Sequence, residues 1–272
     1  MTAEIIENAT EFPPYKVPVL WHSAPDAAAS IVLLPAMGVP AGFYTPFADA
    51  LCEKGYAVLV SEIPGTGDSR PRPSRSSDYG YRDLAERYLP ALVGHAAKRE
   101  PQRPVVLLGH SLGAQLATLA LGLRAVDVAA MVSVAGGHIH YRNWSGMGAA
   151  QVRSIATLFP LLAKVFGYLP GQHVGFGGPQ AQSLINDWSM IIRTGQFSAL
   201  APGFQPPAVP ALCVGIEGDY YAPPKSIESL ASVLGGESEI LPNEAGGNPH
   251  SSWARKPKAV ANFIHQWLTR TL

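Results

Sequence analysis

The feature of the sequence that most constrains its fold is an alternation of short apolar runs with longer segments of helical periodicity. The apolar runs are 17–21, 31–34, 57–61, 105–108, 130–134, 211–215 and 238–241, and several are β-branched and bounded by Gly or Pro. Helical patterns at 43–54, 81–98, 112–123, 224–234 and 257–272 separate them. Strands without a polar face need helices on both sides, so the pattern predicts an α/β fold with a doubly wound, mostly parallel sheet.

One long segment interrupts this alternation. Between the runs ending at 134 and starting at 211 no strand is evident, and the apolar spacing is helical around 152–166 and 180–192. Bare loops of this length are uncommon in compact domains. We therefore expect a single domain over 1–272 that carries a helical cap insertion at 138–207. Because the insertion is rich in aromatic residues, it predicts an apolar pocket wall in which Tyr141, Trp144 and Trp188 contact the substrate.

The residues VVLLGHSLG, 105–113, predict a nucleophile elbow. Gly109, Ser111 and Gly113 form G-x-S-x-G directly between a predicted strand and a predicted helix. The flanking glycines remove Cβ atoms that would clash in so sharp a turn. The helix N-terminus favours a developing oxyanion, so Ser111 is the candidate nucleophile. His110 is interpreted as a structural packing residue.

A serine hydroxyl becomes a good nucleophile only when a base takes its proton. In this type of fold an acid and then a histidine follow the serine, each on a loop after a later strand. The loop IEGDYYAPP, 216–224, contains Glu217 and Asp219, and PNEAGGNPHSSW, 242–253, contains His250. We expect His250 to be the base and Asp219 the acid, because Asp219 lies further into its loop, with Glu217 as the alternative.

Acyl transfer also needs two N–H donors at the tetrahedral oxygen. The backbone N–H of Leu112, directly after the nucleophile, is the first candidate. The second is the N–H of Met37 in the loop PAMGVPAGFY, 35–44, which follows an early strand. The same position of Met37 is compatible with a side chain that only packs over the site.

Composition and motifs exclude several other classes of protein. The 20 basic and 20 acidic residues balance, so no nucleic-acid partner is expected, and Arg70, Arg72 and Arg75 are interpreted as part of a solvated loop. The first strand–turn lacks G-x-G-x-x-G, and no His/Glu cluster has ligand spacing, so neither a cofactor nor a metal is expected. No signal peptide and no membrane span are evident, which favours a cytoplasmic protein whose partner is a small-molecule substrate. A homo-oligomer stays open.

Taken together, these residues resemble the α/β-hydrolase superfamily, in the branch near serine aminopeptidases and monoacylglycerol lipase-like hydrolases, and more narrowly a group of bacterial predicted hydrolases. Two further motifs carry the resemblance: Pro35-Ala36-Met37-Gly38, and the Pro-Gly-x-Gly-x-Ser turn of Pro64, Gly65, Gly67 and Ser69. The similarity covers roughly residues 28–270. It implies the α/β-hydrolase fold, and it implies nucleophile, acid and base roles for Ser111, Asp219 and His250. The chain departs from the family pattern at Gly218 and Pro249.

The sequence therefore predicts a serine hydrolase that cleaves a small or medium-sized, largely apolar carboxylic ester, thioester or amide through an acyl-enzyme. An acyltransferase or biosynthetic enzyme with the same triad is the alternative. A non-catalytic binding protein is the third and least favoured reading, because a fold by itself does not determine function.

Overall fold

The computed structural model of the protein describes residues 1–8, 15–175 and 177–272. Its centre is an eight-stranded sheet in the order β1-β2-β4-β3-β5-β6-β9-β10. The strands are β1 Thr2–Asn8, β2 Tyr15–His22, β3 Ala29–Leu34, β4 Tyr56–Ser61, β5 Val105–His110, β6 Ala130–Val134, β9 Ala211–Ile216 and β10 Glu237–Leu241. From β4 to β10 all neighbours are parallel, whereas β2 pairs antiparallel with β4 and with β1. The predicted mostly parallel, doubly wound sheet is confirmed.

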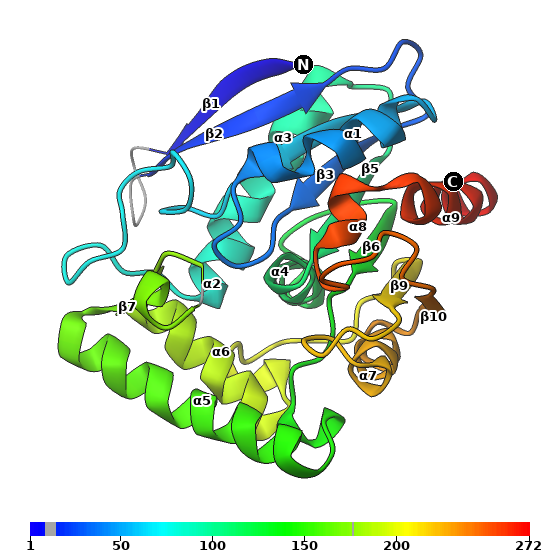
Figure 1. Cartoon of the computed structure of the whole chain (residues 1–272). Helices are drawn as coiled ribbons and strands as arrows, with labels where there is room; N and C mark the ends of the chain where they lie inside the picture. Colours follow the sequence, from blue (N-terminus) through cyan, green and yellow to red (C-terminus); the bar gives the residue numbers. More distant parts are fainter. Residues whose placement is uncertain (9–14, 176) are drawn as a thin grey trace.

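Helices cover both faces of the sheet (Figure 1). One face carries α1 Thr45–Cys52, α8 Ser252–Arg255 and α9 Lys258–Thr271, and the other carries α3 Leu89–Arg99, α4 Leu112–Gly122 and α7 Pro224–Leu234. In α9 the predicted spacing of Val260, Ile264 and Trp267 is the buried face. The helix expected at 81–98 contains a π-helical turn, Leu84–Tyr88, between the short α2 Tyr81–Asp83 and α3.

The first strand is the one element of the sheet that the sequence pattern did not predict. Ile6 is buried, whereas the neighbouring Ile5 is 63% exposed. β1 lies at the edge of the sheet and is bonded only to β2. Only one of its faces is covered, so its sequence contains no continuous apolar run.

Between β6 and β9 the chain leaves the sheet and forms two long helices that lie side by side, α5 Gly146–Phe166 and α6 Gln182–Thr194 (Figure 1). Short 3-10 turns flank them: η3 Tyr141–Asn143, η4 Gly171–His173 and η5 Phe197–Ala199. A further 3-10 turn, η1 Ala41–Tyr44, lies in the body directly before α1. Two three-residue strands, β7 Tyr168–Pro170 and β8 Pro179–Ala181, pair antiparallel here, where the sequence pattern indicated only helices. They are too short to produce a periodic signal.

Two acids connect α6 to the body of the protein. Asp78 Oδ1 accepts a hydrogen bond from the Ser183 N–H (2.8 Å), and Asp187 Oδ2 accepts one from the Tyr81 N–H (2.8 Å). Burial raises the pKa of the Asp187 carboxyl to about 6. The position of α6 over the body therefore depends in part on polar contacts with the segment before α3.

Candidate active site

The turn between β5 and α4 places Ser111 in a strained backbone conformation, with φ 52° and ψ −114°. The flanking glycines allow this turn. A Cβ on Gly109 would lie 2.3 Å from the backbone N of Ala114, and one on Gly113 would lie 2.3 Å from the Leu34 carbonyl oxygen. The second contact also brings the end of β3 against the elbow, so the loop after β3 begins beside Ser111.

The loops after β9 and β10 bring an acid and a histidine to this serine. His250 Nε2 lies 3.1 Å from Ser111 Oγ, and His250 Nδ1 lies 2.8 Å from Asp219 Oδ2. The Asp219 side chain is fully buried, and its Oδ1 accepts hydrogen bonds from the N–H groups of Tyr221 (2.8 Å) and Ala222 (3.2 Å). Glu217 is exposed. Of the two candidate acids, only Asp219 contacts His250.

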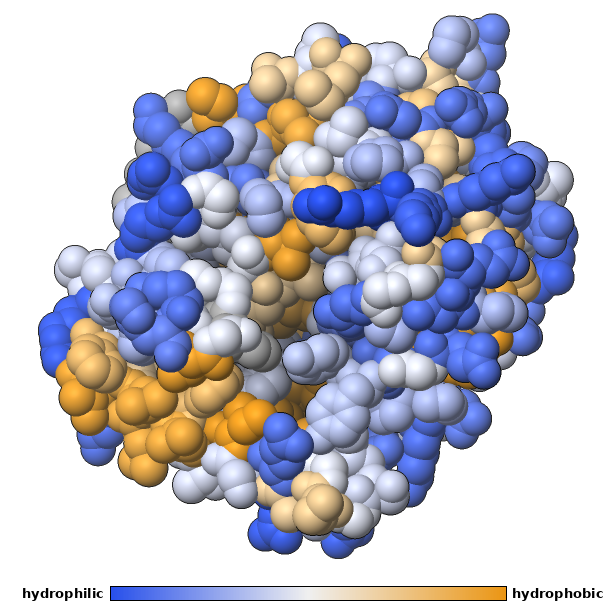
Figure 2. All heavy atoms as spheres, viewed as in Figure 1, coloured by the Kyte–Doolittle hydropathy of each residue, from blue (hydrophilic) through white to orange (hydrophobic). Residues whose placement is uncertain are grey.

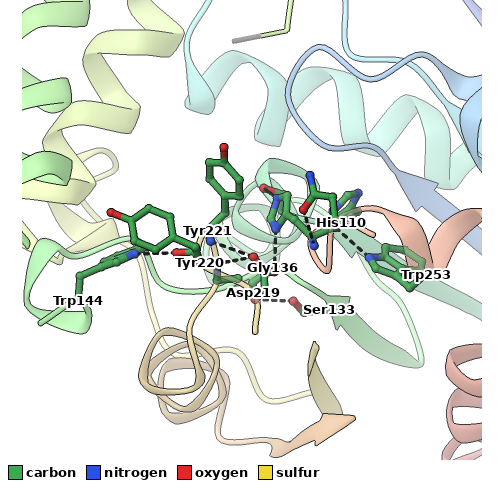
Figure 3. Close-up of polar contacts among 12 residues, drawn as sticks. His110, Ser133, Gly136, Trp144, Asp219, Tyr220, Tyr221 and Trp253 are labelled. Carbon is green, nitrogen blue, oxygen red and sulfur yellow. Dashed lines mark hydrogen bonds and ion pairs between the residues drawn. The ribbon is translucent and has the colours of Figure 1, made fainter. Parts of the chain in front are cut away.

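A buried hydrogen-bond network holds the histidine loop in place. His110 Nε2 and Trp253 Nε1 lie 2.8 and 3.0 Å from the carbonyl oxygen of His250 (Figure 3). His110 Nδ1 lies 2.8 Å from Tyr44 Oη, which accepts a hydrogen bond from the Ala36 N–H (2.9 Å). Burial lowers the pKa of His110 well below its usual range. His110 is therefore neutral, donating through Nε2 and accepting from Tyr44 at Nδ1.

The sequence reading of His110 as a structural residue agrees with its complete burial. Its contact with the His250 backbone, and the part that Tyr44 plays, were not foreseen. No local sequence pattern indicates such a contact, because Tyr44 and His110 are 66 residues apart.

The loop after β3 carries Met37, one of the two expected oxyanion donors. Among the described residues, the N–H groups of Met37 and Leu112 donate to no protein acceptor. The Met37 side chain is half-buried and packs against a small apolar cluster of α5 and α6. Gly38 and Gly177 touch closely: a Cβ on Gly38, at φ +74°, would lie 1.9 Å from the Gly177 carbonyl oxygen. The loop after β3 is thus in contact with the segment between α5 and α6.

An apolar cavity of about 220 Å³ lies between the helical segment that contains α5 and α6 and the loop that carries Asp219. Two of the predicted substrate contacts, Trp144 and Trp188, line it. The other lining residues are Ile139, Gln151, Val152, Ile155, Phe159, Val174, Gly175, Ile192, Tyr220 and Tyr221. Trp144 is held by a hydrogen bond from its Nε1 to the Tyr220 carbonyl (2.8 Å; Figure 3).

Tyr221 connects this cavity to His250, because the centroids of the two rings lie 5.2 Å apart. The sequence analysis did not single it out, although it stands two residues after Asp219. Tyr141 was expected in the pocket and does not line it. Its ring instead lies beneath the guanidinium groups of Arg142 (5.7 Å) and Arg153 (4.8 Å). Within residues 1–8, 15–175 and 177–272, no group of His, Cys, Asp and Glu side chains is arranged to hold a metal.

The comparison that decides the family is one of sequence. A model of the serine aminopeptidase S33 family matches residues 25–175, which is more than half of the chain. The chain belongs to the serine aminopeptidase S33 family. This S33 protein is thus a serine hydrolase of the α/β-hydrolase superfamily, as its motifs indicated. No curated protein is detectably similar to it in sequence.

Solved structures share the fold of this S33 protein over nearly its whole length. A soluble variant of monoglyceride lipase from Saccharomyces cerevisiae, in complex with a substrate analogue, matches 100% of this chain and 95% of its own, with 18% identity and a TM-score of 0.71. A thermophilic esterase from Thermogutta terrifontis matches 98% and 99%, with 15% identity and a TM-score of 0.64. A monoacylglycerol lipase from Paleococcus ferrophilus matches 94% and 99%, with 14% identity and a TM-score of 0.65. At these identities the likeness establishes the α/β-hydrolase fold.

Proposed function

We propose that the protein is a serine esterase that cleaves a small or medium-sized apolar carboxylic ester through an acyl-enzyme. The observation that carries the proposal is the unbroken series of hydrogen bonds from Asp219 through His250 to Ser111. His250 Nε2 takes the proton of Ser111 Oγ as the oxygen attacks the ester carbonyl. Asp219 keeps the imidazole in the tautomer with its proton on Nδ1 and stabilises the imidazolium.

The second half of the reaction follows from the same geometry. His250 returns the proton to the leaving alcohol, and water then attacks the acyl-enzyme with His250 as its base. We assign the oxyanion to the backbone N–H groups of Met37 and Leu112, because both stand next to the elbow and neither donates to a protein acceptor. Thioesters and amides remain within reach of this chemistry.

The size and lining of the cavity support an apolar acyl group of limited length. A volume of about 220 Å³ corresponds to about seven water molecules at liquid density. Because a methylene group is about as large as a water molecule, the cavity has room for a short acyl chain. None of the described lining residues is an acid, so the cavity offers no anionic partner for the ammonium group of a peptide N-terminus. The lining therefore favours an ester over an aminopeptidase substrate.

We also propose that residues 138–207 act as a cap that sets substrate choice. Most of the lining residues, from Ile139 to Ile192, belong to this segment. Replacing Trp188 with Ala should broaden the acyl-chain profile toward longer esters and leave the reaction of Ser111 with a small probe unchanged. Phe263→Ala on α9, at the opposite face of the sheet, is the aromatic control. An unchanged profile in Trp188→Ala would contradict the cap proposal.

The nucleophile is tested with a fluorophosphonate probe and a panel of p-nitrophenyl esters of increasing chain length. Ser111→Ala should lose covalent labelling and nearly all turnover while circular dichroism stays that of the wild type. Ser145→Ala, an exposed serine before α5 with no capping hydrogen bond, is the matched control. Labelling of Ser111→Ala at the wild-type rate would refute the assignment. Product analysis with added alcohols separates hydrolysis from the alternative, acyl transfer.

A further inference from the structure

The outer side of α5 exposes large apolar side chains that no other part of the described chain covers. Leu158, Leu161 and Val165 are 53%, 57% and 64% exposed, and their spacing puts them on one side of the helix. Phe166 (50%), the last residue of α5, and Val174 (37%), after η4, are exposed as well. We call these five residues the α5 face. Figure 2 shows it as an apolar patch at the lower left of the molecule, over the C-terminal half of the helix. Contiguous apolar patches of this kind mark binding surfaces.

The charged side chains of α5, and the one that reaches its C-terminal end, are positive. The charged residues of α5 are Arg153 and Lys164, and the helix contains no acid. Arg75 reaches its C-terminal end, where the guanidinium donates to the Val165 carbonyl oxygen and the side chain packs on Gly167. In the part of the chain that the structure describes, none of these three cations forms an ion pair. An apolar surface with unpaired cations at its border is complementary to a surface that is apolar inside and anionic outside.

A layer of anionic lipid has this chemistry, whereas a second copy of the chain does not. Two α5 faces packed together would bring the cations of both copies near one another, with no acid of α5 to pair with them. Lipid headgroups would instead neutralise Arg75 and Lys164, and the acyl region would take up the leucines.

The α5 face also continues into the cavity. Val174 is exposed and lines the cavity as well, and Ile155 and Phe159 line it from the inner side of α5. The helix is long and apolar enough to cross a membrane, with only 17% of its apolar window buried. However, Phe159 and Ala163 pack in the cluster shared with Ile185 of α6, so the inner side of α5 is occupied by protein. A helix in this position lies along a lipid surface rather than across it.

We propose that the α5 face docks the protein on an anionic lipid surface, from which an apolar ester reaches the cavity behind the helix. The docking step stands on the exposed residues and charges alone. The passage of an ester from the lipid surface into the cavity rests on the proposed esterase function.

The experiment is co-sedimentation of the full-length protein with vesicles of phosphatidylcholine alone or with added phosphatidylglycerol. The wild type should bind the anionic vesicles and release them at high salt, because screening removes the electrostatic part of the attraction. Leu161→Ser should lower the partition coefficient by about tenfold, since one leucine leaves the acyl region. Lys164→Gln should lower it by about fivefold. The matched controls are Ile5→Ser, an equally exposed residue on β1, and Lys98→Gln on α3, and both should bind as the wild type does.

Hydrolysis of a soluble short-chain ester is measured on the same samples, so that the two proposals are tested separately. Loss of vesicle binding in Leu161→Ser with unchanged soluble-ester turnover is the expected result. Absence of vesicle binding by an active wild type would overturn the docking proposal alone. Vesicle binding that Leu161→Ser does not reduce would also overturn it. So would a wild-type dimer in sedimentation velocity that Leu161→Ser converts to a monomer, because the α5 face would then be a contact between copies. Vesicle binding by a protein that neither labels nor hydrolyses esters would instead refute the esterase proposal.

Discussion

Removal of one buried hydroxyl, in Tyr44→Phe, tests whether the network behind the candidate triad of Ser111, His250 and Asp219 supports catalysis. The hydroxyl accepts from the Ala36 N–H at 2.9 Å and donates to His110 Nδ1 at 2.8 Å, and both tyrosine and histidine are fully buried. Phenylalanine fills the same space but leaves both polar groups without a partner. Each unpaired buried group costs about 1–3 kcal/mol, so the free energy of unfolding should fall by about 2–6 kcal/mol. In a chain of this size that corresponds to a Tm lowered by roughly 5–15 °C.

The effect on catalysis follows from what the network holds. His110 supports the backbone carbonyl of His250, and Ala36 stands directly before Met37, the proposed oxyanion donor in the loop after β3. Small displacements of such groups lower rates by up to about 10²-fold, so kcat for a short p-nitrophenyl ester should fall at least about tenfold while KM changes little.

The control is Tyr56→Phe. It removes a hydroxyl that lies 3.1 Å from His265 Nδ1, between β4 and α9 and outside the network behind the triad. That variant should lose at most about 1.5 kcal/mol and keep full kcat. Thermal unfolding and steady-state kinetics of the two variants give the comparison. If Tyr44→Phe matched Tyr56→Phe in both Tm and kcat, the network would have no role in positioning the site.

Three further predictions follow from single residues. Asp219→Asn should lower kcat by several powers of ten, about 10⁴-fold for an orienting acid, whereas Glu217→Gln should stay near the wild type in the same kinetic assay. Burial raises the pKa of the Asp187 carboxyl to about 6, so the folded state keeps this proton to a higher pH than the unfolded chain does. The protonated carboxyl therefore contributes stability that is complete below about pH 4 and is lost as the pH rises through about 6. In the wild type the free energy of unfolding should fall by at most about 3 kcal/mol between pH 4 and 7.5, and Asp187→Asn should abolish this fall, as measured by urea unfolding. Gly38→Ala should lower Tm and turnover together, because a Cβ there meets backbone, while Gly42→Ala, where a Cβ meets nothing within 4 Å, should change neither.

Much of the fold was predictable because local patterns report burial directly. Fully buried parallel strands such as β3 and β5 are continuous apolar runs, and α9 keeps its apolar residues on one side at helical spacing. The short strands β7 and β8 and the edge strand β1 were not predicted. β7 and β8 have only three residues each, and β1 is an edge strand in which Ile6 is buried and Ile5 exposed, so none of them leaves an apolar run in the chain.

The elbow at Ser111 was predictable for a stronger reason, since G-x-S-x-G between a strand and a helix permits little other geometry. The order of the chain predicted Asp219 and His250 on loops after later strands, and the structure brings both loops to Ser111. Which residues surround them was decided only in three dimensions. Tyr141 points to two arginines and not into the cavity, Tyr221 joins the cavity to His250, and Tyr44 supports His110.

The sequence by itself therefore determined most of the elements, seven of the eight strands of the sheet and the candidates for the chemistry, because hydrophobic periodicity and backbone sterics act over a few neighbouring positions. Only the tertiary structure decided which loops meet, how the segment between α5 and α6 touches Gly38, and which side of α5 stays uncovered. Those outcomes depend on contacts between positions far apart in the chain. Ser183 and Asp78 are 105 residues apart, and His110 and His250 are 140 apart. Contacts at such separations are set by the packing of the whole chain, and no local stretch of sequence encodes them.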